Sequence, residues 1–168
     1  FDRSFLQLFP DVAIITSTDA DHLDIYGDVN TIREAFAEFA GQIKENGALI
    51  LKKGVEIDLS KVKATVYSYT FNGEADFCPV NLQPVEGGYF RFDLAYPAFT
   101  TIYGNSVEAG TIEGCTVGIP GWVNVENGIA AAAAALIGGI GPQKVKEALA
   151  AFQGVERRFD VHINTAKV

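Results

Sequence analysis

The sequence predicts an α/β fold in which a mixed sheet, partly parallel and partly an antiparallel hairpin, is flanked by helices. Residues 12–51 run in the order strand, helix, strand, which is typical of a parallel sheet. Residues 77–96 contain two segments around Glu86-Gly87-Gly88, which indicates a β-hairpin with a glycine-containing loop. Residues 124–152 contain two helical patterns separated by glycines. The 168 residues, 48% of them hydrophobic, are enough for one sizeable core.

The parallel part is predicted from two apolar runs and one helical stripe. Residues 12–16 and 48–51 are short apolar runs that suit strands buried on both faces of a sheet. Between them, a helix is expected over residues 29–45, with Asp28 as its N-cap and Asn46-Gly47 as its C-terminal signal. The residues of its apolar stripe recur at helical spacing and should pack against the sheet: Ile32, Phe36, Phe39 and Ile43.

The second half of the sheet is expected to turn antiparallel. Residues 63–71 alternate as a strand and are rich in residues that favour strands. Residues 77–85 and 89–96 form the expected hairpin, and residues 111–117 are expected to add one more strand. The aromatic residues gathered in the hairpin favour a packed antiparallel face over a ligand platform.

Two helices are expected near the end of the sequence. The first covers residues 124–137 and contains six consecutive alanines, which have high helix propensity and let backbones approach closely. Gly138-Gly139 should end it, and Pro142 suits the first position of the next helix, which should end by Gly154. The second helix has an apolar stripe at helical spacing, formed by Val145, Ala148, Leu149 and Phe152.

Composition excludes several classes of function. A net charge of −8 argues against a general nucleic-acid binder, which would show a basic patch. No apolar segment is long enough to span a bilayer, and neither a signal peptide nor a membrane partner is expected. The separation of Cys78 and Cys115 favours reduced thiols in a cytosolic protein, although a single disulfide stays open. The sequence starts without Met, and we expect it to be a piece of a longer polypeptide.

The loop after the first strand is the first candidate site. Ser17, Asp19, Asp21, His22 and Asp24 follow the apolar run directly. Ligands of open α/β sheets bind at the carboxyl ends of the strands, and carboxylate oxygens with a histidine nitrogen suit Mg²⁺. An acidic, solvated turn with a structural histidine is the alternative. A Zn²⁺ hydrolase would need more nitrogen ligands than His22 and His162.

Two further groups of polar residues could bind a nucleotide. Asn124 and Asn127 lie three apart at the start of a predicted helix and share a face, so their amides match the donor and acceptor edge of adenine. Helix N-capping is the alternative, and Asn124 fits it better than Asn127. Arg157-Arg158 could bind phosphate or ribose, or form surface salt bridges. Lys52-Lys53 could contact phosphate or be solvated, and no G-x-x-x-x-G-K-[ST] loop is present.

Three motifs, in this order along the chain, resemble those of the Mur ligase family. Ala-Asp-His-Leu-Asp at residues 20–24 resembles the family's A-D-H-x-D loop. Gly-Trp-Val-Asn-Val-Glu-Asn at residues 121–127 resembles G-x-H-N-x-x-N-A, with Val123 in place of the usual His and Gly128 in place of the usual Ala. Gly-Val-Glu-Arg-Arg-Phe at residues 154–159 resembles G-x-x-R-R-F.

The resemblance implies roles for five residues. It implies that His22 is a metal ligand and a catalytic residue, and that Asn124 and Asn127 bind the adenine of ATP. It places Arg158 next to the nucleotide. It places Ser17 where relatives often have an Asn near the substrate, so Ser17 is expected to bind substrate.

The resemblance also implies an activity. Mur ligases form amide bonds with ATP and Mg²⁺ through an acyl phosphate, and this sequence looks most like a bacterial, cytoplasmic member that adds L-alanine to UDP-N-acetylmuramate in peptidoglycan synthesis. Residues 1–154 would be the later part of a P-loop-type central ATP-binding domain, without the P-loop, and residues 155–168 the start of the C-terminal ligase domain. The 168 residues alone are expected to be inactive. The alternatives are a Mur-type ligase with another amino-acid or peptide specificity, and a non-catalytic α/β nucleotide-binding module.

Overall fold

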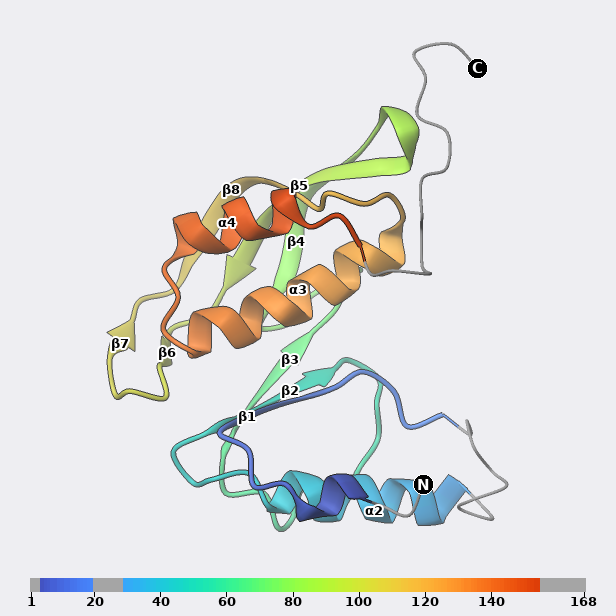
Figure 1. The fold of residues 1–168 in the computed structure, drawn as a ribbon, viewed down its shortest axis with the longest axis vertical. Helices are drawn as coiled ribbons and strands as arrows, with labels where there is room; N and C mark the ends of the chain where they lie inside the picture. Colours follow the sequence, from blue (N-terminus) through green and yellow to red (C-terminus); the bar gives the residue numbers. More distant parts are fainter. Residues whose placement is uncertain (1–3, 20–28, 155–168) are drawn as a thin grey trace.

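The computed structural model describes residues 4–19 and 29–154 and shows an α/β arrangement of two three-stranded sheets, one two-stranded sheet (β6-β7) and three α-helices within those ranges (Figure 1). In chain order the elements are η1 (Ser4–Gln7), β1 (Val12–Ile15), α2 (Val29–Gly41), β2 (Ala48–Lys52), β3 (Thr65–Tyr69), β4 (Cys78–Val85), η2 (Glu86–Gly88), β5 (Tyr89–Tyr96), β6 (Phe99–Thr100), β7 (Ser106–Val107), β8 (Gly110–Thr116), α3 (Trp122–Ile137) and α4 (Pro142–Ala151). The expected α/β class is confirmed.

The first sheet is parallel and has a helix on each face. Its strand order is β1-β2-β3, and the register sets Ile14 beside Ile50 and Ile50 beside Tyr67. Successive side chains point to opposite faces. One face joins α2 in a core that includes Ile15, Leu49 and Ala40, and the other face packs on α3. Figure 1 shows the strands between these two helices.

The second sheet is antiparallel and continues the first through a single bridge. Its order is β4-β5-β8. The N–H of Phe77, just before β4, donates to the Ser68 carbonyl at 3.0 Å, and the Thr70 N–H donates to the Phe77 carbonyl at 3.2 Å. The expected combination of parallel strands and an antiparallel hairpin is therefore confirmed.

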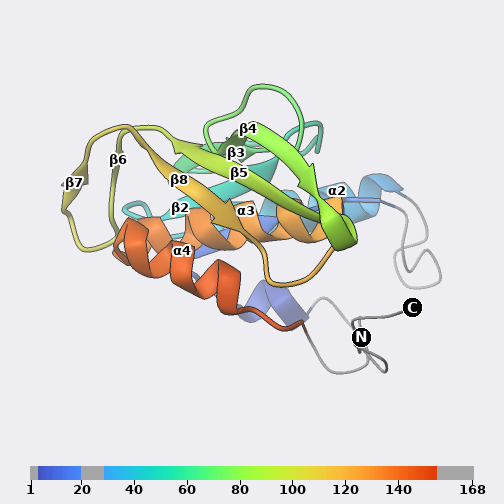
Figure 2. The same ribbon diagram turned by 90° about the horizontal axis from the view of Figure 1, so that it is seen from above.

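Helices α3 and α4 pack on the antiparallel sheet (Figure 2). The alanine run gives α3 a smooth surface, with Ala130, Ala132 and Ala133 all buried. Because alanine ends at Cβ, α3 can lie close to β1, β2 and β5 at once. This helix therefore holds the two sheets against one core.

The expected end of the first helix was wrong. α2 stops at Gly41, four residues before Glu45, and the chain continues in tight turns. Gly47 is required for close approach instead of capping, because a Cβ there would lie 2.2 Å from the backbone oxygen of Asp11. The predicted N-cap Asp28 lies outside the described residues.

The two cysteines do not form a disulfide in this structure. Cys78 and Cys115 both carry free thiols, and burial raises the pKa of the Cys115 thiol. Within residues 4–19 and 29–154, no helix is both long and apolar enough to cross a bilayer.

Candidate functional site

The carboxyl ends of β1, β2 and β3 lie on the side of the molecule where α3 begins (Figure 1). This edge is the usual ligand site of an open α/β sheet. Three segments contribute described residues to it: the loop after β1, the ends of β2 and β3, and the first turns of α3.

After β1, the chain forms a small polar turn. The Ser17 hydroxyl donates to Asp19 Oδ2 at 2.6 Å and accepts from the Asp19 N–H at 2.9 Å. Both side chains are exposed. Ser17 therefore stands at the expected edge with its hydroxyl held by Asp19, and its role toward substrate stays a prediction.

The rest of the predicted metal loop lies outside the described residues. This applies to Asp21, His22 and Asp24. Among the residues that the structure does describe, no group of three or more His, Cys, Asp or Glu side chains could hold a metal ion. The metal role of His22 therefore also stays a prediction.

At the end of β2, both lysines have protein partners. Lys52 Nζ lies 2.7 Å from Glu126 Oε2 on α3, and Lys53 Nζ donates to the Glu74 carbonyl at 2.6 Å. From the sequence, only phosphate contact or solvation is expected for these lysines. Their partners are distant in sequence, so no local pattern indicated them.

Glu126 is the functional candidate that the sequence analysis missed. Its side chain is only 9% exposed, and its Oε1 also accepts from the Phe71 N–H at 3.4 Å. A buried carboxylate needs such partners. The one available signal was an acidic residue among the apolar residues of a helix that packs on a sheet.

Tyr69 lies beside this pair, at the end of β3. Burial, and then the negative charge of Glu126, raise the pKa of Tyr69 to about 12. Its hydroxyl is buried and has no hydrogen-bond partner within the described residues. Tyr69 therefore stays in the neutral phenol form at this edge of the sheet.

The start of α3 carries the two asparagines. The N-cap is Gly121, with φ 102°, and it makes no side-chain cap. The N-cap interpretation of Asn124 is therefore wrong: Asn124 lies in the first turn, where its Nδ2 donates to the Pro120 carbonyl at 2.6 Å. Asn127 is exposed and has no hydrogen-bond partner among the described residues.

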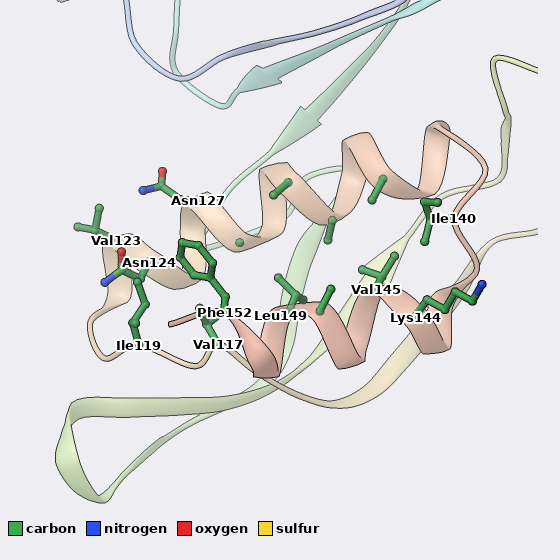
Figure 3. Close-up of a pocket in the computed structure, with 15 residues that line it drawn as sticks. Val117, Ile119, Val123, Asn124, Asn127, Ile140, Lys144, Val145, Leu149 and Phe152 are labelled. Carbon is green, nitrogen blue, oxygen red and sulfur yellow. The ribbon is translucent and has the colours of Figure 1, made fainter. Parts of the chain in front are cut away.

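Asn124 and Asn127 line the same cavity, as their spacing predicted. The cavity has a volume of about 630 Å³ and lies between α3 and α4. Figure 3 shows the two asparagines at one end and Lys144 at the other. Its walls between them are mostly apolar and include Val117, Ile119, Val123, Ala131, Leu149 and Phe152. A mostly apolar cavity of this size with a few polar groups is typical of a small-molecule site. Arg158, the other predicted nucleotide contact, lies outside the described residues.

Comparison with known proteins identifies the protein family to which the chain belongs. Residues 3–135 match the model of the Mur ligase middle domain. The chain therefore belongs to the Mur ligase family, as its three motifs indicated.

The chain is also similar to individual proteins whose names are known. A UDP-N-acetylmuramate–L-alanine ligase of Parabacteroides distasonis is 38% identical over 170 residues, which cover 100% of this chain and 34% of that protein. The chain thus spans about a third of this relative's length. Among solved structures, MurF of Acinetobacter baumannii matches with a TM-score of 0.70 and 22% identity, over 97% of this chain and 33% of that one. MurF of Thermotoga maritima, solved in complex with ADP, matches with a TM-score of 0.57 and 18% identity, over 87% and 31%.

Proposed function

We propose that this chain is the later part of the ATP-binding domain of a bacterial, cytoplasmic UDP-N-acetylmuramate–L-alanine ligase. The observation that carries the proposal is the similarity over the whole chain to a protein of that name. Residues 1–154 would belong to the central domain and residues 155–168 would begin the C-terminal domain. The phosphate-binding loop would come from outside this sequence, which contains no such motif.

Asn124 and Asn127 would read the adenine of ATP. Adenine offers a donor and an acceptor side by side, and a carboxamide can pair with both. One N–H of the Asn124 amide already binds the Pro120 carbonyl, so Asn124 keeps its oxygen and its second N–H for the base, whereas Asn127 offers its whole amide. The apolar wall of the cavity would cover the ring faces. Arg158 would add a contact to the nucleotide.

His22 would hold Mg²⁺ at the end of β1, and Ser17 would contact the UDP-linked substrate. The exposed Asp19 carboxylate shows that oxygen donors of the kind Mg²⁺ prefers are present at this edge. When bound, Mg²⁺ neutralises phosphate oxygens during phosphoryl transfer.

The reaction then needs two displacements. The carboxylate of UDP-N-acetylmuramate would attack the γ-phosphorus of ATP, the bond from that phosphorus to the bridging oxygen would break, and ADP would leave. The amine of L-alanine would attack the acyl carbon of the resulting acyl phosphate. Inorganic phosphate would leave, and the nitrogen would lose a proton.

Phosphate release by the complete polypeptide that contains this chain tests the proposal. With UDP-N-acetylmuramate, ATP and Mg²⁺ present, phosphate release should depend on L-alanine. Strong preference for another amino acid or a peptide would favour a different Mur-type ligase. Failure to bind ADP or turn over ATP would contradict the proposal and favour a non-catalytic module.

A further inference from the structure

Glu126 lies on a different side of α3 from the asparagines that would bind adenine. An α-helix turns about 100° per residue, so Glu126 stands about 200° around the axis from Asn124 and about 100° from Asn127. The structure agrees with this geometry: Glu126 is 7% exposed and Asn127 is exposed. The rotation of α3 that buries Glu126 is therefore the rotation that presents both amides to the cavity.

The start of α3 has one apolar anchor, Val125, which is 1% exposed in the core, and its other contacts among the described residues are few. Gly121 provides no side-chain cap, and its N–H donates to the Gly88 carbonyl at 2.9 Å. The Trp122 ring meets Phe71 at 5.8 Å, yet Trp122 is 52% exposed. The Asn124 amide bonds only to nearby Pro120. Because apolar packing has no fixed direction, the rotation of this end of α3 depends on the polar contacts of its second turn.

Glu126 makes those contacts with both neighbouring strands. Its Oε2 meets Lys52 at the end of β2, and its Oε1 meets the backbone N–H of Phe71, two residues after β3. Lys52 lies opposite Tyr69 in the β2–β3 register, so the carboxylate spans the carboxyl ends of two adjacent strands. One side chain thus joins the helix that carries the amides to the edge of the sheet where the phosphates would lie.

We propose that the Lys52–Glu126 ion pair is a positioning device that fixes the rotation of α3, so that Asn124 and Asn127 face the adenine at a set place relative to the carboxyl edge of the sheet. This inference rests on the proposed function, because it concerns how the nucleotide is bound. Neither residue is a direct nucleotide contact: Lys52 acts through Glu126, and Glu126 acts through the helix.

The test removes the cation and leaves the carboxylate. In Lys52→Met the Glu126 carboxylate loses its charged partner, and it regains solvation only if the start of α3 turns or shifts. In the double variant Lys52→Met/Glu126→Leu no charge needs solvation, so residue 126 stays buried and the helix keeps its rotation. A direct contact between Lys52 and a phosphate would be lost in both variants.

The measurement is the Kd of ADP with Mg²⁺, by calorimetry on the complete polypeptide. We expect Lys52→Met to raise this Kd about tenfold, the lower end of what loss of a supporting partner does at a metal site. The double variant should have a Kd within about twofold of that of the unsubstituted protein. The tenfold rise in Lys52→Met corresponds to about 1.4 kcal/mol of binding free energy, and most of this loss should disappear when no buried charge is left unpaired.

The control is a second ion pair. Lys44 Nζ lies 2.8 Å from Asp11 Oδ1, just before β1 and thus at the opposite edge of the sheet, with both side chains about half exposed. Lys44→Met should leave the Kd unchanged. If Lys52→Met does not fold, Lys52→Gln takes its place, since the amide still donates a hydrogen bond but lacks the charge, and a smaller rise in Kd is expected.

Three results would overturn the inference. An unchanged Kd in the Lys52 variants, even with a lowered melting temperature, would make the pair merely structural. A double variant as weak as Lys52→Met would mean that Lys52 contacts the nucleotide itself. If the unsubstituted protein bound no ADP, the proposed function would fail and the inference with it, whereas the first two results leave that function standing.

Discussion

At the scale of single residues, Asn127 separates nucleotide binding from stability better than Asn124 does. Asn127 has no partner in the described structure, whereas Asn124 binds Pro120. Asn127→Ala should raise the KM for ATP about tenfold, because one hydrogen bond is worth about 1 kcal/mol or somewhat more, and should leave the melting temperature nearly unchanged. Asn124→Ala should change both quantities. Steady-state kinetics and thermal unfolding of both variants check this. A melting temperature lowered as much by Asn127→Ala as by Asn124→Ala would contradict the prediction.

His22 is the residue on which the metal prediction depends. His22→Ala in the complete polypeptide should lower turnover on the order of 100-fold, since even supporting partners of metal ligands are worth about 10-fold to 100-fold. The Mg²⁺ concentration for half-maximal activity should rise as well, because the remaining ligands hold the ion less tightly. Activity measured against Mg²⁺ concentration is the test, and an unchanged midpoint would count against the role.

At this scale, the pairing of the two asparagines could be predicted from the sequence, whereas the Lys52–Glu126 ion pair could not. Asn124 and Asn127 share a cavity because helix geometry relates positions three apart, and that relation is local. The Lys52–Glu126 pair joins residues 74 positions apart, and only the folded chain brings them within 2.7 Å. Contacts between residues this far apart in sequence cannot be predicted from local patterns. From those patterns, the expected partner of Lys52 was therefore only phosphate or solvent.

At the scale of secondary-structure elements, the alanine run of α3 has one side that packs in the core and one side that is exposed. Ala133 is 0% exposed, whereas Ala131 is exposed on the same helix. Ala133→Leu should lower the free energy of unfolding by about 1–3 kcal/mol, because a close-packed interior has no room for a larger side chain. Ala131→Leu is the matched control and should change stability little. Urea unfolding compares the two, and equal stabilities would show that α3 does not pack as closely as described.

Long periodic elements were predictable and short or context-dependent features were not. β1, β2, the hairpin of β4 and β5, α3 and α4 all follow from local patterns. The two-residue strands β6 and β7 are too short to show a period. The end of α2 was placed too late because Asn46-Gly47 resembles a cap, while Gly47 is needed where the chain passes the Asp11 backbone. That requirement is tertiary and leaves no local signal.

At the scale of the whole molecule, the 168 residues hold the end that we propose to bind the base, and their sequence contains no phosphate-binding loop motif. The described site offers two amides and an apolar cavity, while the sequence lacks a P-loop and has a net charge of −8 that repels a polyphosphate. Charge-assisted hydrogen bonds to phosphate are worth about 1.5–3 kcal/mol each, so losing two of them weakens binding on the order of 100-fold. The isolated chain should therefore bind ADP at least that much more weakly than the complete polypeptide and should release no phosphate from ATP. Calorimetry and a phosphate-release assay on both proteins give the comparison, with circular dichroism confirming that the isolated chain is folded. Turnover of UDP-N-acetylmuramate and L-alanine by the 168 residues alone would mean that they contain a phosphate site of their own.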